Sequence, residues 1–298
     1  MGNMIQNKIK GVGVALITPF DNYKVDYEAL GRMVDHVING GVDYIVALGS
    51  TAETATLNIK ERQEVLNFIV ERTAKRVPIV VGMGSNDTHE LVEQLRSFDL
   101  SAAVAILSVV PYYNKPSQEG IYRHYMAVAE ASPVPVILYN VPGRTGVNMT
   151  AETTLRLAKA TDKIVAVKEA SGDIEQMQRI IDGKPHDFVV LSGDDGITVE
   201  LIKRGGEGVI SVAANAFVER FCNCVHNAME GRIAEAEAQI EQLQKPIDLL
   251  FKEGNPSSVK TMTKLMGLTT AEVRLPLVEA SEALATKMKE AIKKYDLR

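Results

Sequence analysis

The sequence predicts an α/β protein, a (β/α)8 (TIM) barrel followed by a C-terminal helical extension. Eight short apolar runs rich in valine, isoleucine and alanine alternate with polar turns and stretches of helical spacing between Gly11 and Ser211. Strands that alternate with helices are typical of a parallel sheet, and eight such units favour closure into a barrel. After Ser211 no strand-like run recurs, and the pattern is helical to the C-terminus.

The main alternative is an open, doubly wound sheet. That fold binds phosphates through a glycine-rich turn, but Gly11-Val12-Gly13 precedes no third glycine in register. A second pair, Gly82 and Gly84, has Asp87 where the third glycine is needed. At 298 residues the chain has the size of one barrel with an appendix. We therefore expect a catalytic barrel over residues 1–224 and a helical domain over 225–298.

Each expected strand is a run of apolar residues that ends at polar or glycine-containing residues. The expected strands cover residues 12–17, 44–48, 79–81, 102–109, 134–139, 164–167, 188–191 and 208–211. The helices between them are expected to start near Tyr27, Ile59, Thr88, Gln118, Ala151, Ile174 and Thr198. The expected capping residues are Asp26, Asp87 with Glu90 as a capping box, Thr150 and Asp173.

The C-terminal part, from Ala216 to Arg298, contains alanine- and glutamate-rich stretches at 233–244 and 280–294. Two proline-containing sites, Lys245-Pro246 and Gly254-Asn255-Pro256, are expected to break the helices. This region is therefore expected to form about three helices.

Composition and charge indicate the compartment and the kinds of partner to expect. The net charge of −5 offers no attraction for nucleic acid or for an anionic membrane surface. The longest apolar run, residues 102–110, is too short to span a bilayer, and residues 1–10 lack the apolar core of a signal peptide. Cys222 and Cys224 fit buried or idle thiols in a reducing compartment. We expect a cytoplasmic protein without nucleic-acid or membrane partners.

The most informative stretch is the run Ile164-Val165-Ala166-Val167, which is typical of a strand buried on both faces and stops at Lys168. A Ser-Gly-Asp turn follows shortly after it. An ammonium at such a strand end loses part of its water, which disfavours the charged form and frees an amine to attack a carbonyl. A lysine that extends into solvent is an equally good interpretation of this stretch alone.

Other polar residues follow the remaining strands, where a barrel enzyme builds its active site. They include hydroxyls, two tyrosines and an arginine, namely Ser50, Thr51, Tyr113, Tyr139 and Arg144. With Lys168 they would supply an amine nucleophile, a phenol that carries protons, hydroxyls that relay them, and a guanidinium that holds a carboxylate.

Each of these residues also has an ordinary interpretation. The tyrosines could be rim aromatics, Arg144 a solvated turn cation, and the hydroxyls helix caps. Asp194 and Asp195 could bind a metal, although helix capping is the more common role. All of these ordinary interpretations would have to hold at once at five strand ends. The convergence of the polar residues on one barrel mouth therefore favours an active site.

Three motifs resemble the pyruvate-dependent class I aldolase superfamily of dihydrodipicolinate synthase and N-acetylneuraminate lyase. They are Gly49-Ser50-Thr51-Ala52-Glu53, Tyr139-Asn140-Val141-Pro142-Gly143-Arg144-Thr145-Gly146 and Val167-Lys168-Glu169-Ala170. The likeness covers essentially the whole chain, and the second motif is similar to the dihydrodipicolinate synthase branch. It implies a lyase of this barrel class, usually a homotetramer built as a dimer of dimers, without a cofactor.

The resemblance implies a Schiff-base condensation of pyruvate with L-aspartate 4-semialdehyde to 4-hydroxy-tetrahydrodipicolinate, the committed step of the diaminopimelate and lysine pathway. Lys168 would form the Schiff base, and Tyr139 would shuttle protons. Thr51 would link Tyr139 to Tyr113, which a neighbouring subunit would contribute. Arg144 would orient the carboxylate of the semialdehyde.

The remaining implied contacts concern pyruvate. Ser50 and Thr51 would hold its carboxylate, while Gly193 and Ile210 would line its pocket. Ser50 stands where the branch more often has threonine, and Ala52 where it has glycine, so Ala52 needs a backbone conformation that alanine can adopt. A further departure is Asn255-Pro256-Ser257-Ser258, where the branch often reads Asn-Pro-Ile-Pro.

In lysine-sensitive relatives the inhibitor lies at the tight-dimer interface. The matching positions here form a possible allosteric site and are Thr54, Ala55, Ile59, Arg62, Asn86, Glu90 and Tyr112. The sensitive forms carry histidines at the positions of Ile59 and Arg62, so we expect weak or absent inhibition by lysine.

Two rival functions remain at this stage. Another aldolase of the superfamily, which cleaves N-acetylneuraminate or a 2-keto-3-deoxy sugar acid, would suit Ser50 but not Arg144. A barrel that only binds a small keto acid would not need the proton relay of Lys168, Tyr139 and Thr51. No metal site is expected, since the five histidines are scattered and form no ligand cluster.

Overall fold

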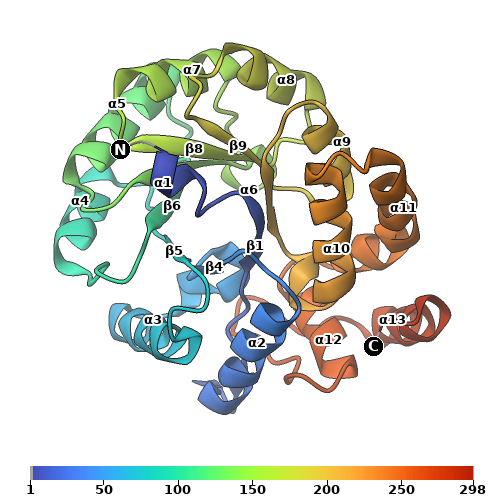
Figure 1. Cartoon of the computed structure of the whole chain (residues 1–298). Coiled ribbons are helices and arrows are strands. Elements are labelled where there is room, and N and C mark those ends of the chain that lie inside the picture. The colour runs from blue at the N-terminus through green and yellow to red at the C-terminus, as the bar shows by residue number, and fades with distance from the viewer. Residues whose placement is uncertain (1–2, 298) are drawn as a thin grey trace.

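The computed structural model describes residues 3–297 as a closed barrel of eight parallel strands with helices around it (Figure 1). This confirms the predicted fold class and excludes the open sheet. The barrel strands are β1 (Gly11–Ala15), β4 (Tyr44–Ala47), β5 (Ile79–Gly82), β6 (Ala105–Val109), β7 (Val136–Asn140), β8 (Ile164–Glu169), β9 (Val189–Ser192) and β10 (Gly208–Ser211). They are hydrogen-bonded in the order β1, β10, β9, β8, β7, β6, β5, β4, and β4 pairs with β1 to close the barrel.

The helices lie outside the strands and at the two ends of the barrel. They are α1 (Asn3–Gln6), α2 (Tyr27–Asn39), α3 (Ile59–Thr73), α4 (Thr88–Ser97), α5 (Gln118–Ala131), α6 (Pro142–Thr145), α7 (Ala151–Ala160), α8 (Ile174–Gly183), α9 (Thr198–Lys203), α10 (Val218–Met229), α11 (Ile233–Leu249), α12 (Ser257–Leu265) and α13 (Glu282–Tyr295). All seven predicted helix starts are confirmed. A short hairpin of β2 (Phe20–Asp21) and β3 (Lys24–Val25) was not expected from the sequence.

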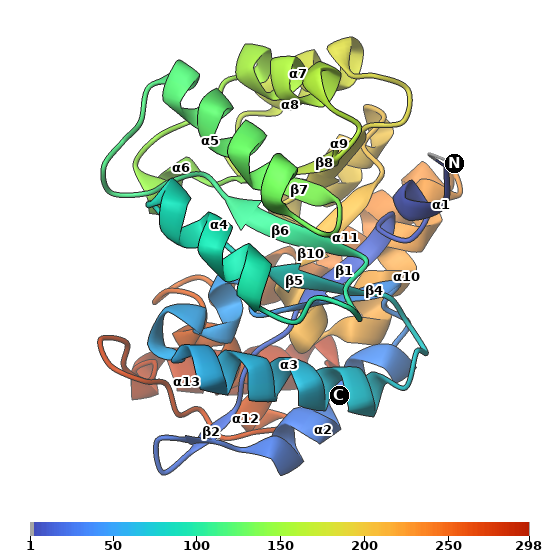
Figure 2. The same ribbon diagram turned by 90° about the vertical axis from the view of Figure 1, so that its left-hand side faces the viewer.

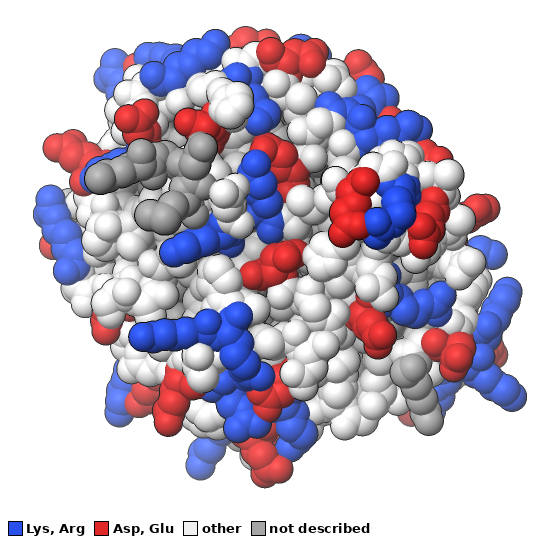
Figure 3. All heavy atoms as spheres, viewed as in Figure 1, with Lys and Arg blue, Asp and Glu red and all other residues white. Residues whose placement is uncertain are grey.

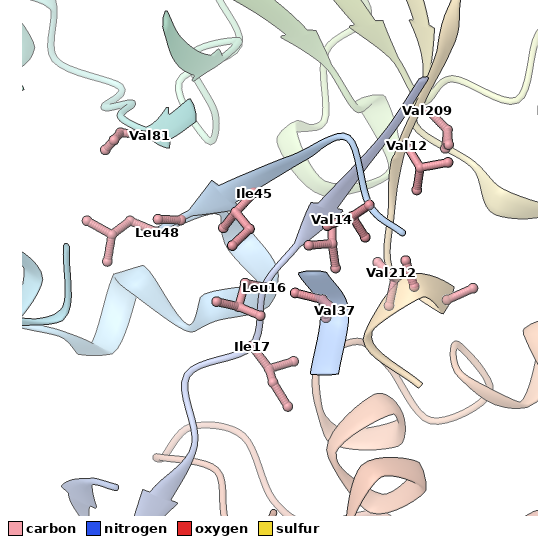
Figure 4. Close-up of a cluster of buried hydrophobic side chains, with 14 of the residues drawn as sticks. Val12, Val14, Leu16, Ile17, Val37, Ile45, Leu48, Val81, Val209 and Val212 are labelled. Carbon is pink, nitrogen blue, oxygen red and sulfur yellow. The ribbon is translucent and has the colours of Figure 1, made fainter. Parts of the chain in front are cut away.

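The strands are buried on both faces, and alternate residues pack in opposite directions. Val12 and Val14 of β1 belong to the large cluster between the strands and the surrounding helices, where Val37 of α2 lies close by (Figure 4). Ala15 of β1 belongs instead to a smaller cluster inside the barrel, together with Ile9. This alternation decides which strand-end side chains reach the barrel mouth.

The helix caps are largely those predicted. Asp26, Thr150 and Asp173 each accept a backbone N–H of their helix. Asp87 caps α4 as expected, but the predicted capping box with Glu90 is wrong. The Glu90 carboxylate accepts hydrogen bonds from Ser85 and Gln94, and the Asp87 N–H donates to the Ser85 hydroxyl.

The C-terminal helices α11, α12 and α13 lie beside the barrel (Figure 1). The predicted break at Lys245-Pro246 is wrong, because Pro246 lies inside α11, which continues to Leu249. A proline removes one N–H from a helix and crowds the carbonyl four residues before it, but the helix here continues past Pro246. Helix α10 runs across the predicted boundary between residues 224 and 225 and packs against both β1 and α11. The division into two domains stays a prediction.

The two ends of the barrel differ. Helix α6 lies at the end where the strands finish and α1 at the opposite end (Figure 2). On the face that carries α1, acidic and basic side chains are mixed rather than gathered into a patch of one sign (Figure 3).

No helix among residues 3–297 combines the length and the apolar character needed to cross a membrane. Met1 and Gly2, the first two residues of the N-terminal stretch 1–10, lie outside the described residues.

Candidate active site

Lys168 and Tyr139 lie side by side at the ends of neighbouring strands. Tyr139 of β7 is the register partner of Lys168 of β8. Tyr139 belongs to the cluster inside the barrel, and Lys168 lies two residues after Ala166 of the same cluster, so both side chains point inward. The Lys168 Nζ atom is 4.4 Å from the centre of the Tyr139 ring, and Lys168 is 5% exposed. The sequence-based alternative of a lysine extending into solvent is therefore wrong.

A cavity of about 200 Å³ opens at this point. Its lining contains the predicted residues Ser50, Thr51, Tyr139, Arg144, Lys168 and Gly193. Pockets for drug-sized ligands are larger, roughly 300–1,000 Å³, so this volume suits a substrate of few atoms. Ile210, also predicted here, belongs to the buried cluster inside the barrel and does not itself line the cavity.

Gly193 is needed for the approach of strand β9 to the lysine. A Cβ atom at this position would lie 2.5 Å from the Cβ of Ala170 and 3.1 Å from the Cε of Lys168. Both distances are shorter than an ordinary van der Waals contact, so a larger residue would force Ala170 to move and would crowd the Lys168 side chain.

Ser50 and Thr51 lie in a short 3-10 helix, η1 (Ser50–Ala52), that follows β4. The residue with a left-handed backbone in this turn is Glu53, with φ of 56°. Ala52 is not among the residues of positive φ, so the replacement of the usual glycine is accommodated without strain.

Asn255, which precedes α12, contacts two of the predicted residues. Its amide Nδ2 donates to the Thr51 hydroxyl at 2.9 Å, and its backbone carbonyl accepts from Arg144 Nη2 at 3.0 Å. Because the Thr51 hydroxyl is the acceptor in this bond, it keeps its own proton for donation. Asn255 was not assigned a site role from the sequence, since it lies 204 positions from Thr51 and no local pattern links the two.

Tyr113 does not reach the cavity within one chain. It lies in the loop after β6, its N–H donates to the Thr145 carbonyl, and its side chain is 86% exposed. Its φ of 71° is uncommon for a residue with a large side chain. A side chain exposed to this extent is not part of the core of the chain.

A second cavity of about 470 Å³ adjoins the first and shares Ser50, Tyr139 and Arg144 with it. Five of the predicted allosteric residues line it, namely Thr54, Ala55, Ile59, Arg62 and Tyr112. The other two, Asn86 and Glu90, do not. Arg62 is half-buried, and its Nε donates to the Leu57 carbonyl at 3.0 Å.

A buried ion pair supports the turn that carries Ser50 and Thr51. The carboxylate of Glu53 contacts the ammonium of Lys260 on α12, and both side chains are fully buried. Lys260 also donates to the Glu272 carbonyl, while the second Glu53 oxygen accepts the N–H of Arg274. Burial lowers the pKa of Lys260 to about 8, although Glu53 opposes that shift. The pair joins η1 to the C-terminal helices.

The two cysteines lie far from this chemistry. Cys222 and Cys224 are buried in α10, as predicted. Burial raises the pKa of each thiol to about 12, so neither thiol is ionised at neutral pH.

Comparisons with known proteins identify the family of this chain. Residues 8–295 match the sequence profile of the Dihydrodipicolinate synthetase family. The chain is 49% identical over 296 residues to the 4-hydroxy-tetrahydrodipicolinate synthase of Parabacteroides distasonis, which covers 99% of this chain and 100% of the relative. It is 50% identical to the enzyme of that name from Phocaeicola vulgatus, with the same coverage.

Solved structures that resemble this chain are also dihydrodipicolinate synthases. The crystal structure of dihydrodipicolinate synthase from Aquifex aeolicus superposes with a TM-score of 0.94 at 39% identity, covering 97% of this chain and 99% of that one. The enzyme from Cyanidioschyzon merolae, solved with lysine bound, superposes with a TM-score of 0.93 at 35% identity and covers 98% and 100%.

Proposed function

We propose that this chain, which belongs to the dihydrodipicolinate synthetase family, joins pyruvate to L-aspartate 4-semialdehyde through a Schiff base on Lys168. The chain is a lyase that forms 4-hydroxy-tetrahydrodipicolinate, and this reaction is the committed step of diaminopimelate and lysine biosynthesis. The observation that supports the assignment of Lys168 is its place in the barrel mouth, buried beside Tyr139 and facing the small cavity.

The first half of the reaction takes place on pyruvate. The Lys168 amine attacks the ketone carbon, a water molecule leaves, and a positively charged iminium remains. This nitrogen accepts electrons from the C–H bond when a methyl proton departs, which gives an enamine. Tyr139 is proposed to carry these protons, and the position of its ring, with its centre 4.4 Å from the lysine Nζ, supports this role.

The second half forms the carbon–carbon bond. The enamine carbon attacks the aldehyde of the semialdehyde, and the amino group of the product then displaces Lys168 as the ring closes. Arg144 is proposed to hold the carboxylate of this second substrate at the cavity mouth. Ser50 and Thr51 are proposed to hold the carboxylate of pyruvate.

Steady-state turnover tests this assignment. The chain is expected to consume pyruvate only when L-aspartate 4-semialdehyde is present, and not to release pyruvate from N-acetylneuraminate or a 2-keto-3-deoxy sugar acid. Cleavage of a sugar acid at a comparable rate would favour the rival aldolase, and binding of pyruvate without turnover would favour the sensor.

Replacing Arg144 with alanine is expected to raise KM for L-aspartate 4-semialdehyde far more than KM for pyruvate. Loss of a charge-assisted contact to a carboxylate costs about 1.5–3 kcal/mol, which corresponds to roughly ten- to a hundredfold. Arg144→Lys is the matched control: it keeps the charge but not the two-pronged geometry, so its defect should be intermediate. Equal increases for both substrates would mean that Arg144 acts only through its bond to Asn255.

We also propose a homotetramer built as a dimer of dimers, located in the cytoplasm, in which Tyr113 enters the active site of the neighbouring subunit. The exposure of its ring in a single chain supports this arrangement. Mixing inactive Tyr113→Phe with inactive Lys168→Ala subunits should restore activity, because each mixed dimer has one site with both groups. Random exchange would give about a quarter of the wild-type activity. Demonstrated exchange without recovery would contradict the role in trans.

Inhibition by L-lysine is expected to be weak. Arg62 lines the second cavity and is held there by its bond to Leu57, and Ile59 offers no hydrogen bond. A bound ammonium 4 Å from the guanidinium would experience a repulsion of about 4 kcal/mol at an effective dielectric constant of 20. Titration of the initial rate with L-lysine at subsaturating pyruvate measures this. Half-inhibition well below millimolar would contradict the argument.

A further inference from the structure

Glu169 is a fully buried carboxylate directly beside the lysine, on the opposite face of the same strand. Successive side chains of a strand point to opposite faces, so Glu169 points away from the cavity that Lys168 faces. Asn140 has the same relation to Tyr139 on β7, and Asn140 is the register partner of Glu169. The two strands therefore carry two register pairs. Tyr139 and Lys168 face the inside of the barrel, and Asn140 and Glu169 lie on the opposite face of the same strands.

The pair behind the cavity is joined by hydrogen bonds. The Asn140 amide Nδ2 lies 3.1 and 3.0 Å from the two oxygens of Glu169. The Gln176 amide donates to the same carboxylate at 3.1 Å, and the Ser171 backbone N–H donates at 2.8 Å. Burial raises the pKa of Glu169, but all of these partners are N–H donors, so their bonds stabilise the ionised form. Hydrogen bonds to an ionised acceptor are stronger than those to a neutral one, so these donors fix the position of the Glu169 carboxylate firmly.

The hydrogen bonds of the Asn140 amide allow only one orientation. Its Oδ1 accepts the backbone N–H of Met149 at 2.9 Å, so its Nδ2 must face Glu169. The same Nδ2 also contacts Asn148 Oδ1 at 2.7 Å, and Gln176 exchanges hydrogen bonds with Asn148. These bonds close the loop between residues 140 and 149, which carries Arg144.

We propose that Asn140, Asn148, Glu169 and Gln176, here called the strand-end network, position the active site from behind. The inference rests on the proposed function. The bond between Asn140 and Glu169 sets the spacing of Tyr139 and Lys168, and the bonds to Asn148 hold the loop of Arg144. No member of the network lines the cavity, so these are positioning residues and not catalytic ones.

The central experiment is a reciprocal exchange of the acid and the amide. In Glu169→Gln, an amide that donates replaces an oxygen that accepts from the Asn140 and Gln176 amides, so donors face donors. In Asn140→Asp, two carboxylates face each other. Each single variant should lower kcat about ten- to a hundredfold, as small misplacements of reacting groups do. The double variant, Asn140→Asp with Glu169→Gln, restores one acid facing one amide and should recover at least part of this loss.

The control for loss of stability is Glu207→Gln, at the opposite end of the barrel. Glu207 is partly buried and binds Lys184, Lys10 and the Val190 N–H. This variant should lower the melting temperature while kcat and both KM values remain those of the wild type. Kinetics are compared at a temperature at which every variant is folded.

A second variant tests whether the network holds the loop that carries Arg144. It remains informative if Glu169→Gln does not fold. Asn148→Ala, at an exposed position, removes bonds to Asn140 and Gln176. It should raise KM for L-aspartate 4-semialdehyde about two- to tenfold, with the rate of borohydride trapping by pyruvate unchanged. An unchanged KM would overturn the proposed hold on the loop.

The outcomes separate this inference from the function on which it rests. If pyruvate and borohydride do not label Lys168 in the wild-type enzyme, the proposed function itself fails. If the wild type is labelled but Glu169→Gln has wild-type kinetics, or the double variant is no more active than the single variants, the positioning role is overturned. Normal labelling, impaired single variants and recovery in the double variant support it.

Discussion

Replacing Lys168 with arginine is expected to abolish turnover, with a loss on the order of 10⁴-fold or more. A guanidinium stays protonated at every relevant pH, so it has no electron pair with which to attack the ketone. The substitution keeps a long cationic side chain in the cavity, and the protein should therefore remain folded. The matched control is Lys163→Arg near the start of the same strand, where Lys163 binds the Glu130 and Ser132 carbonyls.

Measurement of kcat for both variants, with thermal unfolding as the check on folding, decides this prediction. The control should keep wild-type turnover, because its side chain lies at the other end of β8 from the cavity. A folded Lys168→Arg enzyme with substantial activity would show that the amine of Lys168 is not the nucleophile.

The largest expected effect on stability comes from Lys260→Met. This change leaves the Glu53 carboxylate buried without its cation, and removal of one partner of a buried pair costs about 3–5 kcal/mol. At roughly 2–4 °C per kcal/mol for a domain of this size, the melting temperature should fall by about 10 °C. The double variant Glu53→Gln with Lys260→Met should lose less than the sum of the single variants.

A matched control lies on the same helix. Lys264 is half-exposed and sits 3.6 Å from Glu279, also at the surface, and such pairs contribute about 0–1 kcal/mol. Lys264→Met should therefore barely change the melting temperature. If Lys260→Met were no more destabilising than this control, the buried pair would not hold the turn of Ser50 and Thr51 in place.

The barrel and the inward-facing residues could be predicted because their signals are local. Each apolar run marks a strand, and the carboxyl ends of parallel barrel strands converge, so the sequence alone placed Lys168 and Tyr139 at the same barrel mouth. Strand limits were less accurate: the expected strand at 102–109 begins only at Ala105, and β8 continues through Glu169. Apolar composition does not distinguish a strand from the turn that leads into it.

The supporting contacts could not be predicted, because they join distant segments. Lys260 lies 207 positions from Glu53, and Asn255 lies 204 positions from Thr51. No periodicity or motif connects such residues; the docking of the C-terminal helices against the barrel brings them together. Strand alternation does place Glu169 away from the cavity, but it does not reveal that Asn140 and Gln176 are its partners.

The central claim is that Lys168 forms a covalent imine with pyruvate, and borohydride reduction followed by peptide mass mapping tests it most directly. Reduction in the presence of pyruvate should inactivate the enzyme irreversibly and add the mass of the reduced adduct to the peptide that contains Lys168. Omission of pyruvate should leave both activity and mass unchanged. An adduct on a different lysine, or full activity after reduction with pyruvate, would contradict the account.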